Sequence, residues 1–266
     1  MVKRRADEIL VEQGLAPNRS KARALIMAGQ VRIGDNVIDK AGTAIEPDAQ
    51  LQVEAGPQFV SRGGTKLAHA LDLWEVDPSG MICADFGSST GGFTDLLLQR
   101  GAERVYAIDV GYGQLDYTLR QDERVVVMER TNARYLESLP EQVDLVVIDV
   151  SFISLTQVFD AVMKVWKPGS GSCIALVKPQ FEAGREQVGR GGVVRDTRIH
   201  RQVLQDVSAK ALASGLHPRS VTASPITGPK GNREFLVLLD QDASEAPAFE
   251  KQIATAVGQN GKSNEG

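Results

Sequence analysis

The stretch from Cys83 to Leu98, CADFGSSTGGFTDLLL, decides the fold because it joins three patterns in one order. A short apolar run predicts a buried strand, a glycine-rich turn follows, and FTDLLL has the apolar spacing of a helix. From residue 64 to residue 240, further Val/Ile/Leu runs alternate with helical patterns, and the last two runs indicate an antiparallel hairpin at one edge. We therefore expect an α/β fold with a Rossmann-like, doubly wound, mostly parallel sheet.

The glycine-rich turn from Gly87 to Gly92 argues against two common ligand types. A P-loop for ATP or GTP requires a lysine after its last glycine, whereas Phe93 follows Gly92. The dinucleotide fingerprint requires a second glycine where Ser89 stands, because the backbone there approaches a pyrophosphate. The turn therefore indicates a ligand without a phosphate group.

Two acidic residues near this turn indicate which kind of ligand it could bind. Asp85 lies in the strand before the turn, and Asp109 ends the next strand. One carboxylate can hold an ammonium, loop N–H groups can hold a carboxylate, and a second carboxylate can accept hydrogen bonds from ribose hydroxyls. S-adenosylmethionine carries all three groups; the alternative is a structural turn with solvated carboxylates. The cofactor-binding residues expected in this region are Asp85, Gly87, Ser88, Ser89, Thr90, Gly91, Gly92 and Asp109.

The first 40 residues differ in charge from the rest of the chain. They carry eight Lys and Arg and five Asp and Glu, a net charge of +3, whereas the whole chain has −4. Their pattern predicts two short helices, a hairpin with its turn at residues 34–36, and a further strand, which is a small α+β module. Arg19, Lys21 and Arg23 cluster at the start of the second helix, where free N–H groups and the helix dipole favour a phosphate. An ordinary solvated helix face is the alternative.

These patterns divide the chain into four segments. Residues 1–55 form the basic module, residues 56–63 a linker, and residues 64–240 the α/β domain. Residues 241–266 contain one short helical pattern and a Gly/Asn/Ser-rich end, so we expect a partly disordered tail.

Composition argues against several other classes of protein. Cys83 and Cys173 each lie within an apolar run, so we expect two reduced core cysteines and neither a disulfide framework nor a zinc site. The three histidines lack metal-ligand spacing, so no metal site is expected. No apolar run approaches the ~18 residues of a membrane span, and the basic N-terminus lacks the apolar segment of a signal peptide. We expect a cytoplasmic protein that does not bind membranes.

Four ionisable residues stand where this type of fold gathers its chemistry. Lys66 opens the first helix of the α/β domain, Asp149 and Lys178 end apolar runs, and Glu234 precedes the last run. Because the carboxyl ends of parallel strands meet at one edge, Asp149 and Lys178 should face the same crevice as the glycine-rich turn. Each residue alone is more often a solvated charge or an ion-pair partner than a catalyst.

Several longer motifs resemble one known family. SRGGTKL, DFGSSTGGFTDLLL, DVGYGQL, ERTNAR, DVSFISL, VKPQFE and GNREFL occur in this order, and NRSKARALIMAGQVRIG precedes them. Together they resemble the TlyA family of rRNA 2′-O-methyltransferases, in which an S-four-like RNA-binding module precedes an FtsJ-like methyltransferase domain. Some members of that family are labelled hemolysin. The resemblance implies methyl transfer from S-adenosylmethionine to a ribose 2′-hydroxyl, of cytidine, in ribosomal RNA or ribosomal subunits.

The resemblance also implies roles for individual residues. The catalytic tetrad of the family falls on Lys66, Asp149, Lys178 and Glu234, and Asn132 of ERTNAR would lie beside the adenine. A ribose hydroxyl is a weak nucleophile at neutral pH, so we assign proton acceptance to Lys178, assisted by the positive charge of Lys66, while Asp149 and Glu234 hold the lysines and the hydroxyl in line with the methyl group. The alternative is that a carboxylate next to Lys178 keeps this lysine charged.

We predict the RNA-binding residues from the positively charged side chains of two segments. The basic module supplies one group of them, and a flexible, glycine-rich stretch at residues 184–198 supplies the other, although an ordinary solvated loop is the alternative there. The expected residues are Arg5, Arg19, Lys21, Arg23, Arg32, Arg185 and Arg190.

Two other functions stay open. A non-catalytic RNA-binding ribosome assembly factor could keep the same fold, but it would not need all four ionisable residues. A membrane-lytic protein, which the hemolysin label suggests, would need an amphipathic or membrane-spanning segment, and we find none in the sequence.

Overall fold

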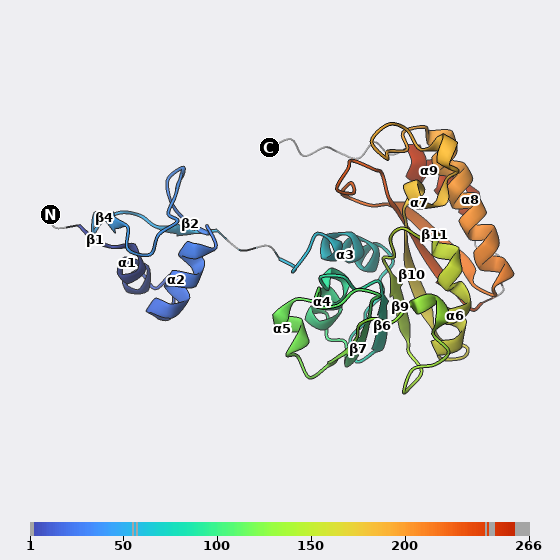
Figure 1. The fold of residues 1–266 in the computed structure, drawn as a ribbon, viewed down its shortest axis with the longest axis horizontal. Coiled ribbons are helices and arrows are strands. Elements are labelled where there is room, and N and C mark those ends of the chain that lie inside the picture. The colour runs from blue at the N-terminus through green and yellow to red at the C-terminus, as the bar shows by residue number, and fades with distance from the viewer. Residues whose placement is uncertain (1–2, 55, 57, 243, 245–247, 259–266) are drawn as a thin grey trace. The chain divides into compact units, whose positions relative to one another are not determined.

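The computed structural model describes residues 3–54, 56, 58–242, 244 and 248–258. The chain divides into two compact units, Met1–Gln58 and Phe59–Gly266 (Figure 1). The N-terminal unit has one hydrophobic core, and the C-terminal unit has a core on each face of its sheet.

The N-terminal unit is a small α+β module, as predicted. Helix α1 (Ala6–Glu12) packs against α2 (Arg19–Met27), and Ile9, Leu10 and Ile26 belong to the buried core. Three short strands form an antiparallel sheet in the order β3-β2-β5, and a separate pair joins β1 to β4. The strands are β1 (Arg4–Arg5), β2 (Val31–Ile33), β3 (Asn36–Val37), β4 (Ala44–Ile45) and β5 (Gln52–Val53).

Local sequence signals explain how these elements begin and end. Asn18 is the N-cap of α2, because its side chain accepts a hydrogen bond from the N–H of Lys21 at 2.9 Å. The hairpin turn is shorter than predicted. Ile33 pairs with Asn36 across residues 34–35, so Asn36 belongs to β3 and not to the turn.

The C-terminal unit is built on a seven-stranded sheet with the order β11-β12-β10-β9-β6-β7-β8. All neighbouring pairs from β10 to β8 are parallel, whereas β12 runs antiparallel to both β10 and β11. The predicted doubly wound sheet with an antiparallel edge hairpin is therefore confirmed. The strands are β6 (Ile82–Phe86), β7 (Arg104–Ile108), β8 (Val125–Met128), β9 (Leu145–Ile148), β10 (Ser172–Val177), β11 (His217–Ala223) and β12 (Phe235–Asp240).

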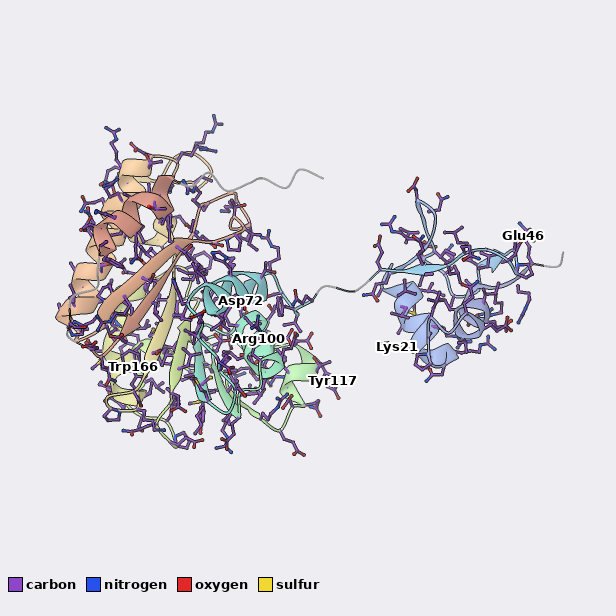
Figure 2. All side chains as sticks on the ribbon, turned by 180° about the vertical axis from the view of Figure 1, so that it is seen from behind. Lys21, Glu46, Asp72, Arg100, Tyr117 and Trp166 are labelled. Atoms are coloured by element: carbon purple, nitrogen blue, oxygen red, sulfur yellow. The ribbon has the colours of Figure 1, made fainter. Side chains whose placement is uncertain are left out.

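Helices cover both faces of this sheet (Figure 1). One face packs against α3, α4 and α5, and the other against α6, α8 and α9. Because side chains alternate along a strand, Cys83 points to the first face and Ala84 and Phe86 to the second. An ion pair of 2.7 Å between Asp72 and Arg100 joins α3 to the end of α4 (Figure 2). The helices are α3 (Gly63–Leu73), α4 (Gly92–Gln99), α5 (Tyr117–Arg120), α6 (Phe159–Val165), α7 (Pro179–Glu182), α8 (Thr197–Ala213) and α9 (Phe249–Gly258), with short 3-10 helices η1 (Ala133–Tyr135), η2 (Leu155–Val158) and η3 (Arg185–Gln187).

The boundary between the units differs from the predicted linker at residues 56–63. Phe59 is buried in the core of the C-terminal unit, and α3 begins at Gly63. A Cβ at position 64 would lie 2.6 Å from the Cβ of Phe59, so Gly64 allows this aromatic side chain to pack on the helix. Part of the predicted linker therefore belongs to the α/β domain.

The C-terminal segment also differs from the predicted tail at residues 241–266. It contains α9, which packs against β11 and α8 and buries Ile253 and Val257. The short helical pattern is thus part of the core, because its apolar face completes one side of the sheet. Residues 259–266, to which the predicted disorder also applied, lie outside the described residues.

Cys83 and Cys173 are both buried free thiols in strands, as predicted. Burial raises the pKa of the Cys83 thiol to about 12, so the thiol stays protonated at neutral pH. Within the described ranges, no helix is long and apolar enough to span a membrane. The same ranges hold no group of three or more His, Cys, Asp or Glu side chains placed to bind a metal ion.

Candidate active site

The glycine-rich turn joins β6 to α4 at the carboxyl edge of the sheet, beside β9. Gly87 and Gly91 have φ angles of +87° and +97°, which glycine adopts without strain. Gly87 is required for a second reason, since a Cβ there would lie 2.8 Å from the carbonyl oxygen of Asp149. Ser89 has a φ angle of +49°, a strained conformation that is typical of ligand-binding loops. The turn therefore brings the ends of β6 and β9 into close contact.

Asp85 is fully buried beneath this turn. Its Oδ2 accepts hydrogen bonds from the N–H and the hydroxyl of Thr94 at 3.0 and 2.7 Å, which ties β6 to α4. Its Oδ1 is buried without a hydrogen-bond partner among the described residues. Burial raises the pKa of Asp85 to about 7, because desolvation disfavours the charged form. Asp85 also lines a cavity of about 190 Å³ next to the turn, the inner cavity.

Asp109 follows β7 and connects two loops through its carboxylate. Its Oδ2 accepts from the N–H of Ser89 at 2.8 Å, and its Oδ1 accepts from the N–H of Gly111 at 2.7 Å. Asp109 and Asn132 line a second cavity of about 320 Å³, the outer cavity. A carboxylate has lone pairs for more than two hydrogen bonds, so Asp109 can still accept from the hydroxyls of a ligand.

The four predicted catalytic residues form two ion pairs at the same edge of the sheet. Lys66 Nζ lies 2.5 Å from Oε2 of Glu234, and Lys178 Nζ lies 2.5 Å from Oδ1 of Asp149. Glu234 reaches this edge because β12 is antiparallel, so the residue before β12 lies where β10 ends. Lys66, Lys178 and Glu234 are only 7%, 8% and 2% exposed. Buried ion pairs add little net stability, so their position at the wall of a cavity makes these four residues candidates for a role in the reaction.

This pairing changes one part of the expected chemistry. From the sequence, Lys66 is expected to act on Lys178 through its positive charge, but in the structure each lysine is paired with its own carboxylate. Two ionised pairs carry no net charge, so Lys66 supplies no unbalanced positive charge to its neighbour. Ser151 adds a third polar group, because Lys178 Nζ donates a hydrogen bond to its hydroxyl at 2.7 Å.

Three cavities meet at Asp149. This residue lines the inner cavity, the outer cavity and a third one of about 390 Å³, the tetrad cavity, which also contains Lys66, Lys178 and Glu234. A ligand that fills the inner and outer cavities would therefore touch a second ligand in the tetrad cavity beside Asp149. The arrangement is suited to transfer of a group between two bound molecules.

Ser151 and Phe152 of the motif DVSFISL also belong to this site, although their role was not predicted from the sequence. Phe152 lines both the outer and the tetrad cavity, has a φ angle of +67° and is 87% exposed. Its ring centroid lies 5.1 Å from that of Phe181. An exposed aromatic ring on strained backbone is typical of a ligand-binding position. The only sequence signal was the motif itself, because neither exposure nor φ can be read from one chain.

The glycine-rich stretch 184–198 lines the tetrad cavity and is hydrogen-bonded to Asn232. Asn232 is 2% exposed. Its side chain accepts a hydrogen bond from the N–H of Val194 at 3.0 Å and donates one to the carbonyl oxygen of Gly192 at 2.8 Å. Arg185 and Arg190 are exposed on it. These two hydrogen bonds tie the stretch to Asn232, and both predicted RNA-binding arginines face solvent.

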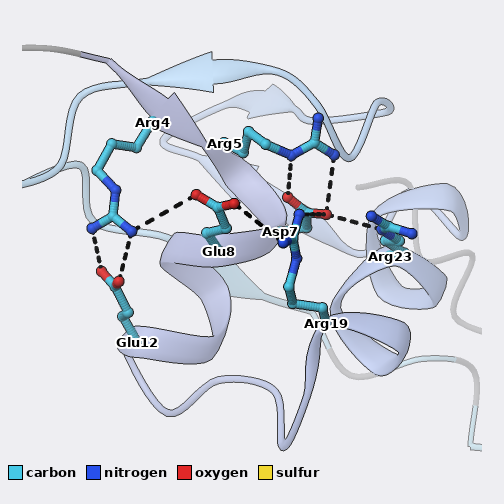
Figure 3. A network of polar contacts seen from close by, with 7 residues as sticks. All are labelled: Arg4, Arg5, Asp7, Glu8, Glu12, Arg19 and Arg23. Carbon is cyan, nitrogen blue, oxygen red and sulfur yellow. Dashed lines mark hydrogen bonds and ion pairs between the residues drawn. The ribbon is translucent and has the colours of Figure 1, made fainter.

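The predicted RNA-binding residues of the N-terminal unit divide into two groups. Arg5, Arg19 and Arg23 converge on the carboxylate of Asp7 (Figure 3). Arg32 instead lies 2.6 Å from a carboxylate oxygen of Glu54, which balances its charge within the unit.

Lys21 stands apart from both groups. Its side chain is exposed on α2, and its N–H takes part in the cap of that helix (Figure 2). It can therefore meet a phosphate only as a point charge.

Comparisons with known proteins agree with this division into two units. Residues 59–241 match the family model described as FtsJ-like methyltransferase, and residues 4–51 match that of the S4 domain. A 16S/23S rRNA (cytidine-2′-O)-methyltransferase TlyA of Mycobacterium tuberculosis is 46% identical over 91% of this chain and 91% of its own. Hemolysin A of Brachyspira hyodysenteriae is 38% identical over 87% of this chain and 98% of its own. A solved structure of a Streptococcus thermophilus protein is 42% identical, covers 96% of both chains and has a TM-score of 0.71.

The mostly parallel sheet and the two family matches define a methyltransferase enzyme with an S4 domain at its N-terminus. Within this class, the chain belongs to the TlyA family of FtsJ-like methyltransferases. The resemblance found in the sequence motifs is thus confirmed.

Proposed function

We propose that this protein transfers a methyl group from S-adenosylmethionine to a ribose 2′-hydroxyl of cytidine in ribosomal RNA, acting on ribosomal RNA or subunits in the cytoplasm. The observation that carries the proposal is the meeting of three cavities at Asp149, beside the ion pair of Lys178. The M. tuberculosis relative is named for this activity, and the S4 domain supports RNA as the substrate.

The inner and outer cavities fit the proposed cofactor. Its ammonium needs an acceptor, and Oδ1 of Asp85 is a buried acceptor with no partner of its own among the described residues. Its ribose hydroxyls would meet Asp109, its adenine would lie beside Asn132, and the backbone from Gly87 to Gly92 would enclose it. When bound, S-adenosylmethionine supplies an electrophilic methyl group.

The tetrad cavity is the proposed place for the acceptor ribose. The ion pair of Lys178 and Asp149 lies at its wall, so this pair can hold the 2′-hydroxyl and take up its proton as the oxygen gains the methyl group. Lys178 accepts that proton once it has passed one of its own to Asp149, because an ammonium group has no lone pair. The hydroxyl of Ser151 keeps Lys178 in place, and the exposed ring of Phe152 offers a surface on which the base can stack. Proton transfer of this kind contributes roughly 10²–10⁴ in rate, and alignment contributes at least as much.

The pair of Lys66 and Glu234 forms another part of the same wall. A Cβ at position 228 would lie 2.5 Å from Oε1 of Glu234, so Gly228 lets the preceding loop close over this carboxylate. We assign Lys66 and Glu234 to positioning of the hydroxyl. A non-catalytic assembly factor would have no use for two lysine–carboxylate pairs, with both lysines and Glu234 buried, at one cavity.

Single-turnover methylation of ribosomal RNA tests this assignment. Lys178→Ala should lower the transfer rate by about 10² or more while leaving cofactor and RNA affinities within a few fold, because its role lies in the transition state. Lys164→Ala is the matched control, since Lys164 is also paired with a carboxylate, that of Glu137, but on the exposed surface. Equal rates for both variants would show that Lys178 is only a structural ion-pair partner.

A further inference from the structure

Asp7 is a buried acid within a group of arginines of the N-terminal unit. It is 0% exposed and accepts four hydrogen bonds from three guanidinium groups (Figure 3). Arg5 donates two of them at 3.0 and 3.1 Å, Arg23 donates one at 3.0 Å and Arg19 donates one at 3.3 Å. The arginines come from β1 and from two turns of α2, so a single carboxylate joins segments that are distant in sequence.

The three arginines keep much of their binding capacity for a ligand. Their side chains are 45% (Arg5), 48% (Arg19) and 53% (Arg23) exposed. Each guanidinium has five N–H donors, so the bonds to Asp7 leave most donors unused, although Arg19 also lies 3.3 Å from Glu8. The same bonds hold the pKa of Asp7 well below its usual range, so the carboxylate stays charged at neutral pH.

We propose that Asp7 is a positioning residue for RNA binding: its carboxylate fixes Arg5, Arg19 and Arg23 as one preorganised array for adjacent phosphates. This inference rests on the proposed RNA substrate. Guanidinium groups bind phosphate through paired, parallel hydrogen bonds, which require a defined orientation. Side chains that are already ordered lose less conformational entropy when they bind, so the array binds more tightly than three independent arginines.

The proposal and net charge predict opposite results for one substitution. Asp7→Asn removes a negative charge near a polyanion-binding surface, so charge alone predicts tighter RNA binding. The array predicts weaker binding by about tenfold, or 1.4 kcal/mol, because an asparagine side chain has one acceptor oxygen and its NH₂ group repels the guanidinium donors. Glu12→Gln is the matched control: it removes the same charge from the same helix, but Glu12 pairs with Arg4 and does not contact the array.

A second variant keeps the proposal testable if Asp7→Asn unfolds the unit. Arg23→Lys keeps the positive charge at a half-exposed position but loses the Nε donor to Asp7 and the planar fork. The array predicts several-fold weaker RNA binding for this variant. A surface of independent positive charges predicts no change.

The experiment is fluorescence anisotropy of the full-length protein with labelled ribosomal RNA at several salt concentrations, with thermal unfolding of each variant alongside. We expect weaker RNA binding for Asp7→Asn and Arg23→Lys. We expect equal or tighter RNA binding for Glu12→Gln, whose methyl-transfer rate should stay within about twofold of wild type. A folded Asp7→Asn protein that binds RNA at least as tightly as wild type, or an unchanged Arg23→Lys protein, overturns the proposal. Failure of the wild-type protein to bind ribosomal RNA would instead overturn the proposed function.

Discussion

Replacing Asp85 with asparagine should change the free energy of unfolding in opposite directions at low and high pH. The pKa of Asp85 is about 7 in the folded protein because of burial, against an ordinary value of 3.8. At 1.36 kcal/mol per pH unit, this difference in pKa means that ionisation of Asp85 lowers the free energy of unfolding by at most about 4 kcal/mol. Because the folded pKa lies above the unfolded one, the folded state is destabilised as pH rises from about 4 to about 7, and the cost is absent below that window.

The asparagine side chain stays neutral and avoids this cost at pH 8. Its oxygen can still accept hydrogen bonds from Thr94, but its NH₂ group takes the place of the unpartnered buried oxygen and has no acceptor there. A buried donor without an acceptor lowers the free energy of unfolding by about 1–3 kcal/mol at every pH. We therefore expect Asp85→Asn to be more stable than the wild type by about 1–3 kcal/mol at pH 8, and less stable at pH 4.5. Urea unfolding without cofactor at both pH values measures the difference. The same difference at pH 4.5 and pH 8 would refute a raised pKa for this carboxyl.

Three further substitutions probe other parts of the structure. Asp109→Ala should weaken S-adenosylmethionine binding by about 1.5–3 kcal/mol, measured by calorimetry on the folded variant; unchanged affinity would place the ribose elsewhere. Glu234→Gln should destabilise the fold by about 3–5 kcal/mol in urea, because it leaves Lys66 buried without its partner, and adding Lys66→Met should restore stability but not methyl transfer. If the double variant methylates RNA normally, this pair has no role in the reaction. Deleting residues 249–258 exposes the core that Ile253 and Val257 cover, so the free energy of unfolding measured in urea should fall by about 3–6 kcal/mol. An unchanged urea midpoint would show that α9 is dispensable for stability.

The architecture can be predicted from the sequence because the patterns that indicate strands and helices are local. Strand and helix periodicities are read within short windows, and the parallel topology then places Asp85, Asp109 and Asp149 at one edge of the sheet. The carboxylate partners of the two lysines could not be predicted in the same way. Lys66 and Glu234 are 168 residues apart, and only the antiparallel direction of β12 brings them together.

Two other features depend on packing that no local pattern encodes. The helical pattern of α9 is visible in the sequence, but its contact with β11 is a tertiary one, so the segment reads as a tail. Asp7 counts against RNA binding when charges are summed, whereas the structure shows that it is buried and bonded to three arginines. The net charge of the N-terminal unit therefore does not show that its carboxylate and its arginines are bonded to one another.

The most direct test of the proposed function is nucleoside mass spectrometry of ribosomal RNA that has been incubated with the protein and S-adenosylmethionine. The RNA should come from cells that lack the protein, so that the acceptor sites are unmethylated. We predict that 2′-O-methylcytidine appears with the wild-type protein and is absent or strongly reduced with Lys178→Ala. A methyl group on a base, or undiminished 2′-O-methylcytidine with Lys178→Ala, would contradict the account.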